Sequence, residues 1–316
     1  MDTGAVPTAF AAGTAARPHA RAGGSVQLNG RAAPWLFLGP GLLITIAFVF
    51  YPFVRTIYNS LTNATPFNAG QLVGLANYQA ALADPLFWIA LRNSALYVVC
   101  VVPFLVVLPL LLALLVERLI PGIGIFRTAI YAPVVASMVV VVIIWQWLFN
   151  DRGMINGMLQ ELHLITKPIP FLSDPWLLLF CAMVVTIWKG LGFYMVVYLA
   201  VLGNVPRQLH EAAQMDGAGA VRRFRTVTMP AMRSTMILVG IISSVSAFRV
   251  FSEVYLMAGP TAGPGGQDTT LVTLIQSSGT GLSAQLGYAS AVSVVLFVLT
   301  LGLLVVNLRL TQSKEN

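Results

Sequence analysis

The chain has 316 residues and a formal net charge of +7, and 57% of its residues are hydrophobic while only 9% are charged. Its mean hydropathy of +0.82 lies far outside the range of water-soluble domains, in which about half of the residues are apolar. The composition therefore excludes a soluble globular protein and indicates an integral membrane protein. The basic residues are dispersed over one predicted membrane face without a recognisable nucleic-acid-binding fold, which excludes a nucleic-acid partner.

The first segment, residues 1–34, is rich in Ala, Gly, Thr and Arg and has no apolar stretch before Trp35. It therefore lacks the apolar core of a cleavable signal peptide. Its side chains cannot bury enough apolar surface to offset the entropy of ordering the chain. We expect a disordered N-terminal tail here and a short C-terminal tail at 311–316, with one transmembrane domain over 35–310.

The predicted domain contains six apolar spans. A helix of about 20 apolar residues crosses the hydrocarbon of a bilayer, and these runs are too long and too continuous for the strands of a barrel. Prolines within the first two spans would each break or bend an ordinary helix. We therefore predict an all-α polytopic membrane protein with spans at 35–58, 88–116, 126–149, 175–203, 233–257 and 286–309.

The orientation in the membrane follows from the 18 Lys and Arg residues. If the N-terminus is cytoplasmic, 12 of them fall in or beside cytoplasmic segments and only 2, Arg152 and Lys167, fall in external loops. Cytoplasmic loops of membrane proteins carry an excess of Lys and Arg. The distribution therefore predicts that both termini are cytoplasmic.

The sequence shows no pattern for catalysis, metal binding or nucleotide binding. Both cysteines, Cys100 and Cys181, fall inside spans, where a thiol behaves as a small buried hydrophobe. His19, His163 and His210 have no metal-ligand spacing. No Walker A pattern occurs either. We expect a chain that is not an enzyme, has no catalytic or metal site and binds no cofactor.

The longest polar insert between apolar runs is the arginine-rich loop 206–230. Pro206 suits the first position of a helix, and glycine inside a helix costs about 1 kcal/mol relative to alanine, so Gly217 and Gly219 should end this helix. A second short helix is predicted from Ala220 to about Thr228, ending before Pro230. The loop should form two short helices joined at a glycine bend.

The same loop reads E-A-A, two residues, D-G-A, then a phenylalanine and a final proline. It resembles the cytoplasmic signature loop of binding-protein-dependent ABC importer permeases, with Val227 and Met229 in place of the usual isoleucine and leucine. The resemblance implies docking on a cytoplasmic ATPase, with Glu211 and Asp216 orienting the loop by salt bridges and caps and Gly217 permitting the bend. The residues carried over to this coupling role are Glu211, Ala212, Ala213, Asp216, Gly217, Ala218, Arg222, Arg223, Phe224 and Pro230.

A basic loop could also simply follow the charge rule and pack against lipid headgroups. That alternative accounts for the arginines alone, whereas it leaves the spacing of E-A-A and D-G-A unexplained. The arginines themselves are expected to face phosphates of the ATPase or of lipid.

The resemblance extends over most of residues 35–310. Gly74–Tyr78, Trp188–Phe193 and Phe251–Gly266 are similar to stretches of the six-span carbohydrate importers related to the maltose and glycerol-phosphate permeases. Ser252 stands where that group has aspartate. The resemblance implies the type I transmembrane domain of ABC importers.

Sugars bind to aromatic faces while polar groups satisfy their hydroxyls, so polar and aromatic residues within the spans are the candidate substrate contacts. Trp145 and Trp147 better suit the aromatic belt at the membrane interface. Arg249 and Glu253 are four residues apart, which favours a structural or gating ion pair on one helix. The candidate residues of the substrate pathway are Asn93, Trp188, Lys189, Tyr194, Arg249 and Glu253.

The sequence therefore predicts one permease subunit of an ATP-driven, binding-protein-dependent sugar importer in the plasma membrane of a bacterium or archaeon. The expected partners are a second homologous permease, an ABC ATPase dimer that holds ATP and Mg, an extracytoplasmic solute-binding protein, membrane lipid and a sugar. Two alternatives stay open. One is an importer for glycerol phosphodiesters, amino acids or another polar solute, and the other is an ion-coupled secondary carrier that works alone.

Overall fold

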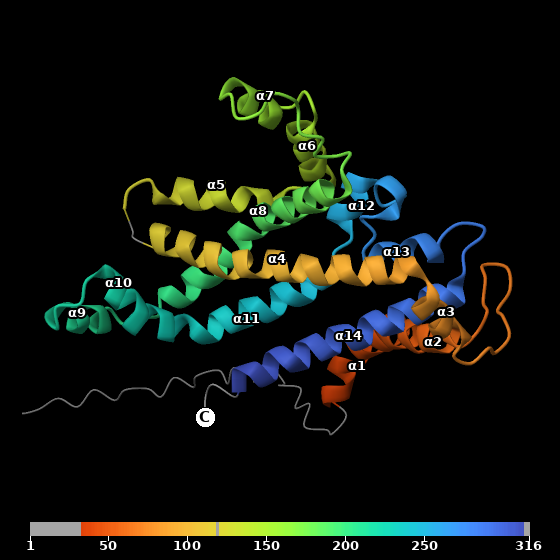
Figure 1. Cartoon of the computed structure of the whole chain (residues 1–316). Coiled ribbons are helices and arrows are strands. Elements are labelled where there is room, and N and C mark those ends of the chain that lie inside the picture. Colours follow the sequence, from red (N-terminus) through yellow and green to blue (C-terminus); the bar gives the residue numbers. More distant parts are fainter. Residues whose placement is uncertain (1–32, 118–119, 313–316) are drawn as a thin grey trace, which may run out of the picture. The chain divides into compact units, whose positions relative to one another are not determined.

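The computed structural model describes residues 33–117 and 120–312, which form helices and connecting loops (Figure 1). Within these ranges the only β-type pairings are two isolated bridges in the loop that follows residue 60. The chain divides into two compact units, Met1–Pro52 and Phe53–Asn316. The tails predicted at 1–34 and 311–316 lie almost entirely outside the described residues.

The first unit contains α1 (Ala33–Thr45), a π-helical turn (Ile46–Phe50) and the start of α2 (Tyr51–Ser60). Proline has no backbone N–H and normally disturbs a helix interior. The wider turn ends at Phe50, two residues before Pro52, and sharp changes in a helix are commonly found at prolines and at π turns. The helical path therefore continues through the proline.

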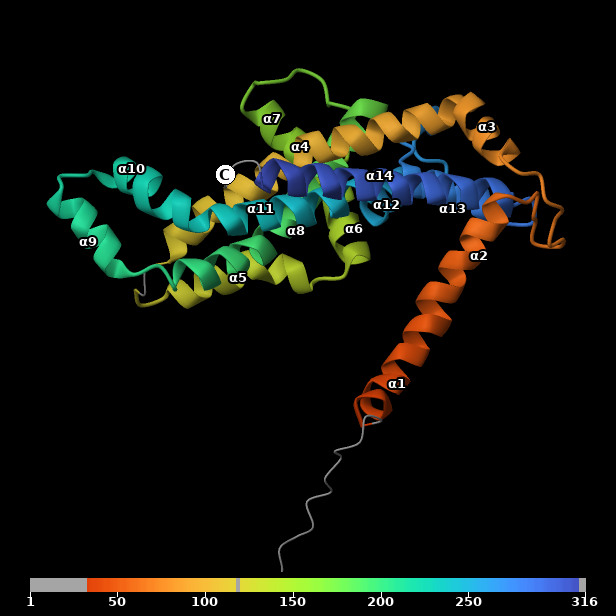
Figure 2. The ribbon, with the colours of Figure 1, turned by 90° about the horizontal axis from the view of Figure 1, so that it is seen from below.

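The second unit is a bundle whose long helices are α4 (Pro85–Val116), α8 (Pro175–Leu202), α11 (Met229–Phe248) and α14 (Leu286–Gln312). Figure 2 shows α4, α8 and α11 side by side, and the main core lies between them. The shorter helices are α3 (Ala76–Ala83), α5 (Ile123–Val135), α6 (Met138–Phe149), α7 (Met154–Glu161), α12 (Ser252–Ala258) and α13 (Leu271–Gly279).

Two of the long helices begin with the same local sequence, an aspartate followed by a proline. The side chain of Asp84 accepts a hydrogen bond from the N–H of Leu86, and that of Asp174 accepts one from the N–H of Leu177. An aspartate at the N-cap satisfies a free helical N–H, and a proline at the next position loses no hydrogen bond. This chemistry defines where α4 and α8 begin.

Six candidate membrane spans are present among the described residues, which confirms the predicted fold class. The prolines of the second span, however, do not interrupt it: α4 is one helix of 32 residues that contains Pro103 and Pro109. Pro109 is buried, and α4 packs along both α8 and α11. Packing against neighbouring helices can outweigh the local cost of a proline, as is common in membranes.

The third predicted span is two helices instead of one. Pro133 lies near the end of α5, and the chain then turns at Ala136 and Ser137, whose ψ angles are 141° and 137°. A prediction of one continuous helix over 126–149 is therefore wrong at this point. Backbone carbonyls at the end of α5 lose their helical partners there, and a side chain from α8 satisfies them, as described below.

The fifth predicted span is also interrupted. It begins well before residue 233 and its main helix, α11, ends at Phe248. Arg249 and Phe251 have non-helical dihedral angles before α12 begins at Ser252. The carbonyl of Val250 accepts a hydrogen bond from the Thr270 hydroxyl at 3.1 Å, so the break is stabilised by tertiary contacts.

Candidate functional site

The loop 206–230 forms a foot at the end of the bundle opposite α12 and α13 (Figure 1). Its first helix is α9 (Arg207–Met215), and its second is α10 (Ala220–Arg223). Between them Gly217 has a φ angle of 72°, in the left-handed region that favours glycine. The predicted pair of short helices with a bend at Gly217 is confirmed.

The sequence predicted that the second helix of the foot ends before Pro230, and this is wrong. α10 passes through a π-helical turn, Phe224–Thr228, directly into α11. Pro230 occupies the first turn of α11, where its missing N–H is accommodated, with the wider turn immediately before it. The foot is therefore joined to the long helix α11 without an intervening loop.

The carboxylates of the foot have no partners among residues 33–117 and 120–312. Glu211 and Asp216 are exposed, and neither side chain makes a hydrogen bond or ion pair with any residue that the structure describes. The salt bridges and caps that the resemblance implies for Glu211 and Asp216 are therefore not formed with the residues that the structure describes. Backbone bonds close the bend instead: the N–H of Gly217 donates to Gln214 O at 2.9 Å and that of Ala218 to Ala213 O at 2.9 Å.

Large apolar side chains are exposed on the same foot. Met215 is 90% exposed, Val221 68% and Leu209 51%. Phe224 is half-buried and packs against the main core, so it anchors the foot to the bundle. Arg222 and Arg225 are exposed, Ala212 is exposed and Ala213 is half-buried. The foot presents apolar and charged groups together on an otherwise open surface.

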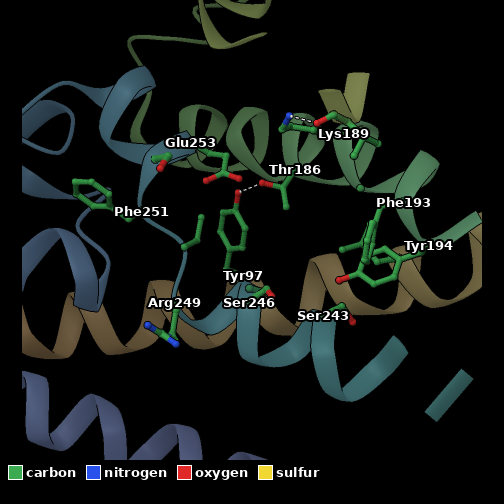
Figure 3. Close-up of a pocket in the computed structure, with 16 residues that line it drawn as sticks. Tyr97, Thr186, Lys189, Phe193, Tyr194, Ser243, Ser246, Arg249, Phe251 and Glu253 are labelled. Carbon is green, nitrogen blue, oxygen red and sulfur yellow. Dashed lines mark hydrogen bonds between the residues drawn. The ribbon is translucent and has the colours of Figure 1, made fainter. Parts of the chain in front are cut away.

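A cavity of about 370 Å³ lies in the middle of the bundle, between α4, α8, α11 and the interrupted segment 249–253 (Figure 3). Binding sites for small molecules have volumes of about 300–1,000 Å³ and combine apolar or aromatic walls with a few polar groups. The walls here are of that kind. The aromatic and polar lining residues are Tyr97, Thr186, Lys189, Phe193, Tyr194, Ser243, Ser246, Arg249, Phe251, Ser252 and Glu253.

One side of the cavity is built around Tyr97, which is completely buried on α4. Its hydroxyl is 2.6 Å from the Thr186 hydroxyl of α8. Figure 3 shows the carboxyl group of Glu253 directed toward the same Tyr97 hydroxyl. Three oxygen-bearing side chains from α4, α8 and α12 therefore meet on this wall.

Lys189 lines the cavity, but its ammonium group is already bound. Its Nζ donates to the carbonyl oxygens of Pro133 at 3.0 Å, Val134 at 3.2 Å and Ala136 at 2.8 Å. These are the carbonyls left free where α5 ends, and a cation at a helix C-terminus is also favoured by the helix dipole. Lys189 therefore fixes the broken helix to α8.

Of the six predicted pathway residues, Lys189, Tyr194, Arg249 and Glu253 line the cavity, whereas Asn93 and Trp188 do not. Asn93 is fully buried and donates to Gln267 O and Thr269 O at 2.7 and 2.9 Å. Trp188 lies edge-on against Trp145, with ring centroids 5.5 Å apart. In this structure Asn93 therefore holds the backbone around residue 268, and Trp188 packs on Trp145.

The proposed ion pair between Arg249 and Glu253 is wrong. The helix breaks between them, and no salt bridge joins them in this part of the described chain. Figure 3 shows Arg249 directed away from Glu253. A spacing of four residues brings side chains together only on an uninterrupted helix.

Several cavity residues were missed by the sequence reasoning, among them Tyr97, Thr186 and Phe193. Two signals were available. Thr186 and Lys189 are three residues apart on α8, as are Ser243 and Ser246 on α11, and that spacing places side chains on one helix face.

Among the described residues no group of three or more His, Cys, Asp or Glu side chains forms a candidate metal site.

The described residues form an all-α bundle with six apolar candidate spans, a central cavity and a two-helix foot, which is the type I fold of ABC importer permeases. Residues 93–312 match the family described as binding-protein-dependent transport system inner membrane component, and the chain belongs to this family.

The similar proteins include known transport subunits. The lactose transport system permease protein LacF of Rhizobium radiobacter is 31% identical over 273 residues, covering 84% of this chain and 89% of the relative. The trehalose/maltose transport system permease protein MalF of Thermococcus litoralis is 29% identical over 284 residues, covering 89% of this chain and 94% of the relative. The resemblance to carbohydrate-import permeases is thereby confirmed.

A solved structure has the same fold. It is that of a bacterial alginate ABC transporter in complex with an alginate pentasaccharide-bound periplasmic protein. The matching chain has a TM-score of 0.77 and 22% sequence identity, and the match covers 87% of this chain and 92% of that chain.

Proposed function

We propose that this chain forms half of the translocation pathway of an ATP-driven importer and that its substrate is a saccharide. The central cavity carries the proposal. It combines the aromatic rings of Phe193, Tyr194 and Phe251 with the exposed hydroxyls of Ser246 and Ser252. Aromatic faces pack on the C–H surfaces of a sugar while hydroxyl groups satisfy its polar edge. The names of the similar permeases support the same substrate class.

We place the foot, α9 and α10, on the cytoplasmic side, together with both termini. The basis is the excess of Lys and Arg in the segments that would then face the cytoplasm. The loops around α3, α7 and α13 then face outward, where an extracytoplasmic solute-binding protein would dock. The alginate importer with its bound periplasmic protein supports such a partner.

In this proposal the foot inserts into an ABC ATPase dimer. The unpaired carboxylates of Glu211 and Asp216, the exposed Arg222 and the exposed Met215 would find their partners there. ATP and Mg would be held by the ATPase, whereas this chain would bind no cofactor and would catalyse no covalent step. A second homologous permease would complete the pathway.

The mechanical link is the continuous path from α10 into α11. α11 has 20 residues, which corresponds to a length of about 30 Å at 1.5 Å per residue. Its far end carries Ser243 and Ser246 in the cavity wall. A displacement of the foot would therefore move that wall, so that ATPase closure and the exposure of substrate are coupled.

Reconstitution tests the proposal. The chain, purified with its co-purifying subunits, is placed in liposomes and uptake of labelled saccharides is measured with and without the ATPase and the binding protein. Uptake that requires ATP and both partners is the expected result. Concentrative uptake by the isolated chain under an ion gradient would instead establish a secondary carrier, and uptake limited to a non-sugar solute would overturn the substrate class.

A further inference from the structure

Loop 259–270, which joins α12 to α13, holds a carboxylate in an unusual environment. Asp268 is 1% exposed, and both of its carboxyl oxygens are buried without a hydrogen-bond partner in the described part of the chain. An ionised carboxylate that is buried without a partner is very unfavourable, and such groups commonly become neutral instead. None of the roles proposed above uses this side chain.

The backbone on both sides of Asp268 is held firmly by α4. The side-chain amide of Asn93 donates to Gln267 O and Thr269 O, the carbonyls that flank the aspartate. The N–H of Leu271 donates to the Ser94 hydroxyl at 3.0 Å, and the N–H of Asp268 itself donates to Ala262 O at 3.0 Å. The carboxyl group is therefore fixed in its site by the fold.

The site leaves little space around the carboxyl group. On one side the carboxyl oxygen lies directly against Gly263, so that a Cβ at that position would overlap it. On another side is a cavity of about 10 Å³, whose lining includes Arg92, Asn93 and Trp176. A volume of that size holds about one water molecule. One water cannot replace the hydration shell of an ionised carboxylate.

Two charged groups face Asp268 from the neighbouring helices. The carboxylate of Asp174, at the start of α8, repels a negative charge on Asp268. The guanidinium of Arg92, on α4, lines the same small cavity but lies 4.7 Å from the centre of the Trp176 ring and makes no salt bridge with Asp268. α13 contributes the hydroxyls of Thr270 and Thr273, which bond to each other at 2.8 Å.

We propose that Asp268 is a proton-binding site that latches loop 259–270 onto α4 when the carboxyl group is neutral and releases it when the group ionises. Burial, followed by the charge of Asp174, raises the pKa of Asp268 from 3.8 to about 7. In a released loop the carboxylate would meet water and return toward its ordinary pKa.

The direction of the pH effect follows from linkage. The closed loop binds the proton more tightly than the released loop, so closure is fully favoured below about pH 4. Between pH 3.8 and about 7 the closing equilibrium weakens as pH rises, by up to about tenfold per pH unit. Above pH 7 it levels off, because Asp268 is then ionised in both forms.

Hydrogen–deuterium exchange of the full-length chain in lipid nanodiscs tests the latch. Protection of the amides in loop 259–270, corrected for the intrinsic pH dependence of exchange, is compared between about pH 5 and pH 8. The wild-type loop is expected to lose protection as pH rises, by up to about tenfold per unit between pH 5 and pH 6 and progressively less from pH 7 to pH 8. Asp268→Asn, which stays neutral, is expected to show no such loss. A pH-independent wild type, or an equal pH dependence in Asp268→Asn, would overturn the proposal.

Two further variants keep the test decisive if Asp268→Asn does not fold. Asp174→Asn retains a side chain that caps helices well while removing the repelling charge. It is expected to move the midpoint of the wild-type transition to lower pH, and an unchanged midpoint would count against the latch. Gly263→Ala would overlap the buried carboxyl group and is expected to lower protection at every pH. Full protection in that variant would contradict the clamped geometry.

Discussion

The foot, residues 206–230, leads into α11, and loop 259–270 follows α12, the short helix after α11. The two segments are built in opposite ways. In the foot, Glu211 and Asp216 have no partner within the described chain and Met215 is almost fully exposed. In loop 259–270, Asn93 and Ser94 hold the backbone from α4, and Asp268 is buried. The contrast fits the proposal that the foot docks on another protein, whereas the loop is held by its own bundle.

The largest expected effect comes from the bend of the foot. Gly217 has a φ angle of 72°, whereas proline is fixed near −65°, so Gly217→Pro should destroy the bend. We expect the variant to insert at normal levels but to lose most ATP-driven uptake. Gly219→Ala is the matched control, because Gly219 has an ordinary φ of −66° and open space around it. Normal uptake by Gly217→Pro at normal protein levels would refute the docking role.

The next largest effect concerns the broken helix between α5 and α6. Lys189→Met would leave the carbonyls of Pro133, Val134 and Ala136 without their shared donor. A hydrogen bond to a charged group contributes about 1.5–3 kcal/mol, so we expect a stability loss of about 3 kcal/mol. The measurement is thermal unfolding of the purified chain. A variant that only raised the KM for uptake and left stability unchanged would show that Lys189 binds substrate instead.

Removing the clamp on loop 259–270 should have a moderate effect on stability, whereas a substitution in the foot should have a small effect. Asn93→Leu removes both donors to the carbonyls of Gln267 and Thr269. Leaving buried carbonyls unpaired costs about 1–3 kcal/mol, so we expect a loss of about 2 kcal/mol. Glu211→Gln, in the foot, should change stability by less than about 0.5 kcal/mol. Equal effects of the two substitutions would erase the contrast between the regions.

A smaller effect than that of Asn93→Leu is expected at the cavity wall. Tyr97→Phe removes the hydrogen bond between the Tyr97 and Thr186 hydroxyls and keeps the ring. A bond of this kind contributes about 1 kcal/mol. A double-mutant cycle with Thr186→Val measures the coupling, and purely additive effects would show that the two hydroxyls do not act together.

Hydropathy was sufficient to find the six spans and the fold class, because a long apolar run has few alternatives in a membrane chain. It did not reveal the breaks at Ala136 and Arg249. Those breaks depend on partners far away in sequence: Lys189 satisfies the carbonyls of α5, and Thr270 binds the carbonyl of Val250. A pattern confined to one helix contains no information about such bonds.

In the candidate sites too, features with a local sequence signal were predicted and features that depend on long-range contacts were not. The bend of the foot was predicted correctly, because Gly217 and the polar residues around it are a local signal. Asn93 was assigned to the pathway although it clamps loop 259–270, and the burial of Asp268 had no local signal at all. The environment of each side chain is created only when α4 and the loop come together. A polar residue within a span is predicted to have a structural or functional role, but its polarity alone does not predict which role.

The exposed apolar side chains of the foot have a consequence for biogenesis. Met215, Val221 and Leu209 present surface that soluble proteins usually cover. If the foot docks on an ATPase as proposed, a copy of the chain made without that partner would display this patch to chaperones and proteases. Its abundance in the cell would therefore follow the supply of the partner, and the ratio of subunits would be regulated by degradation of the unassembled excess.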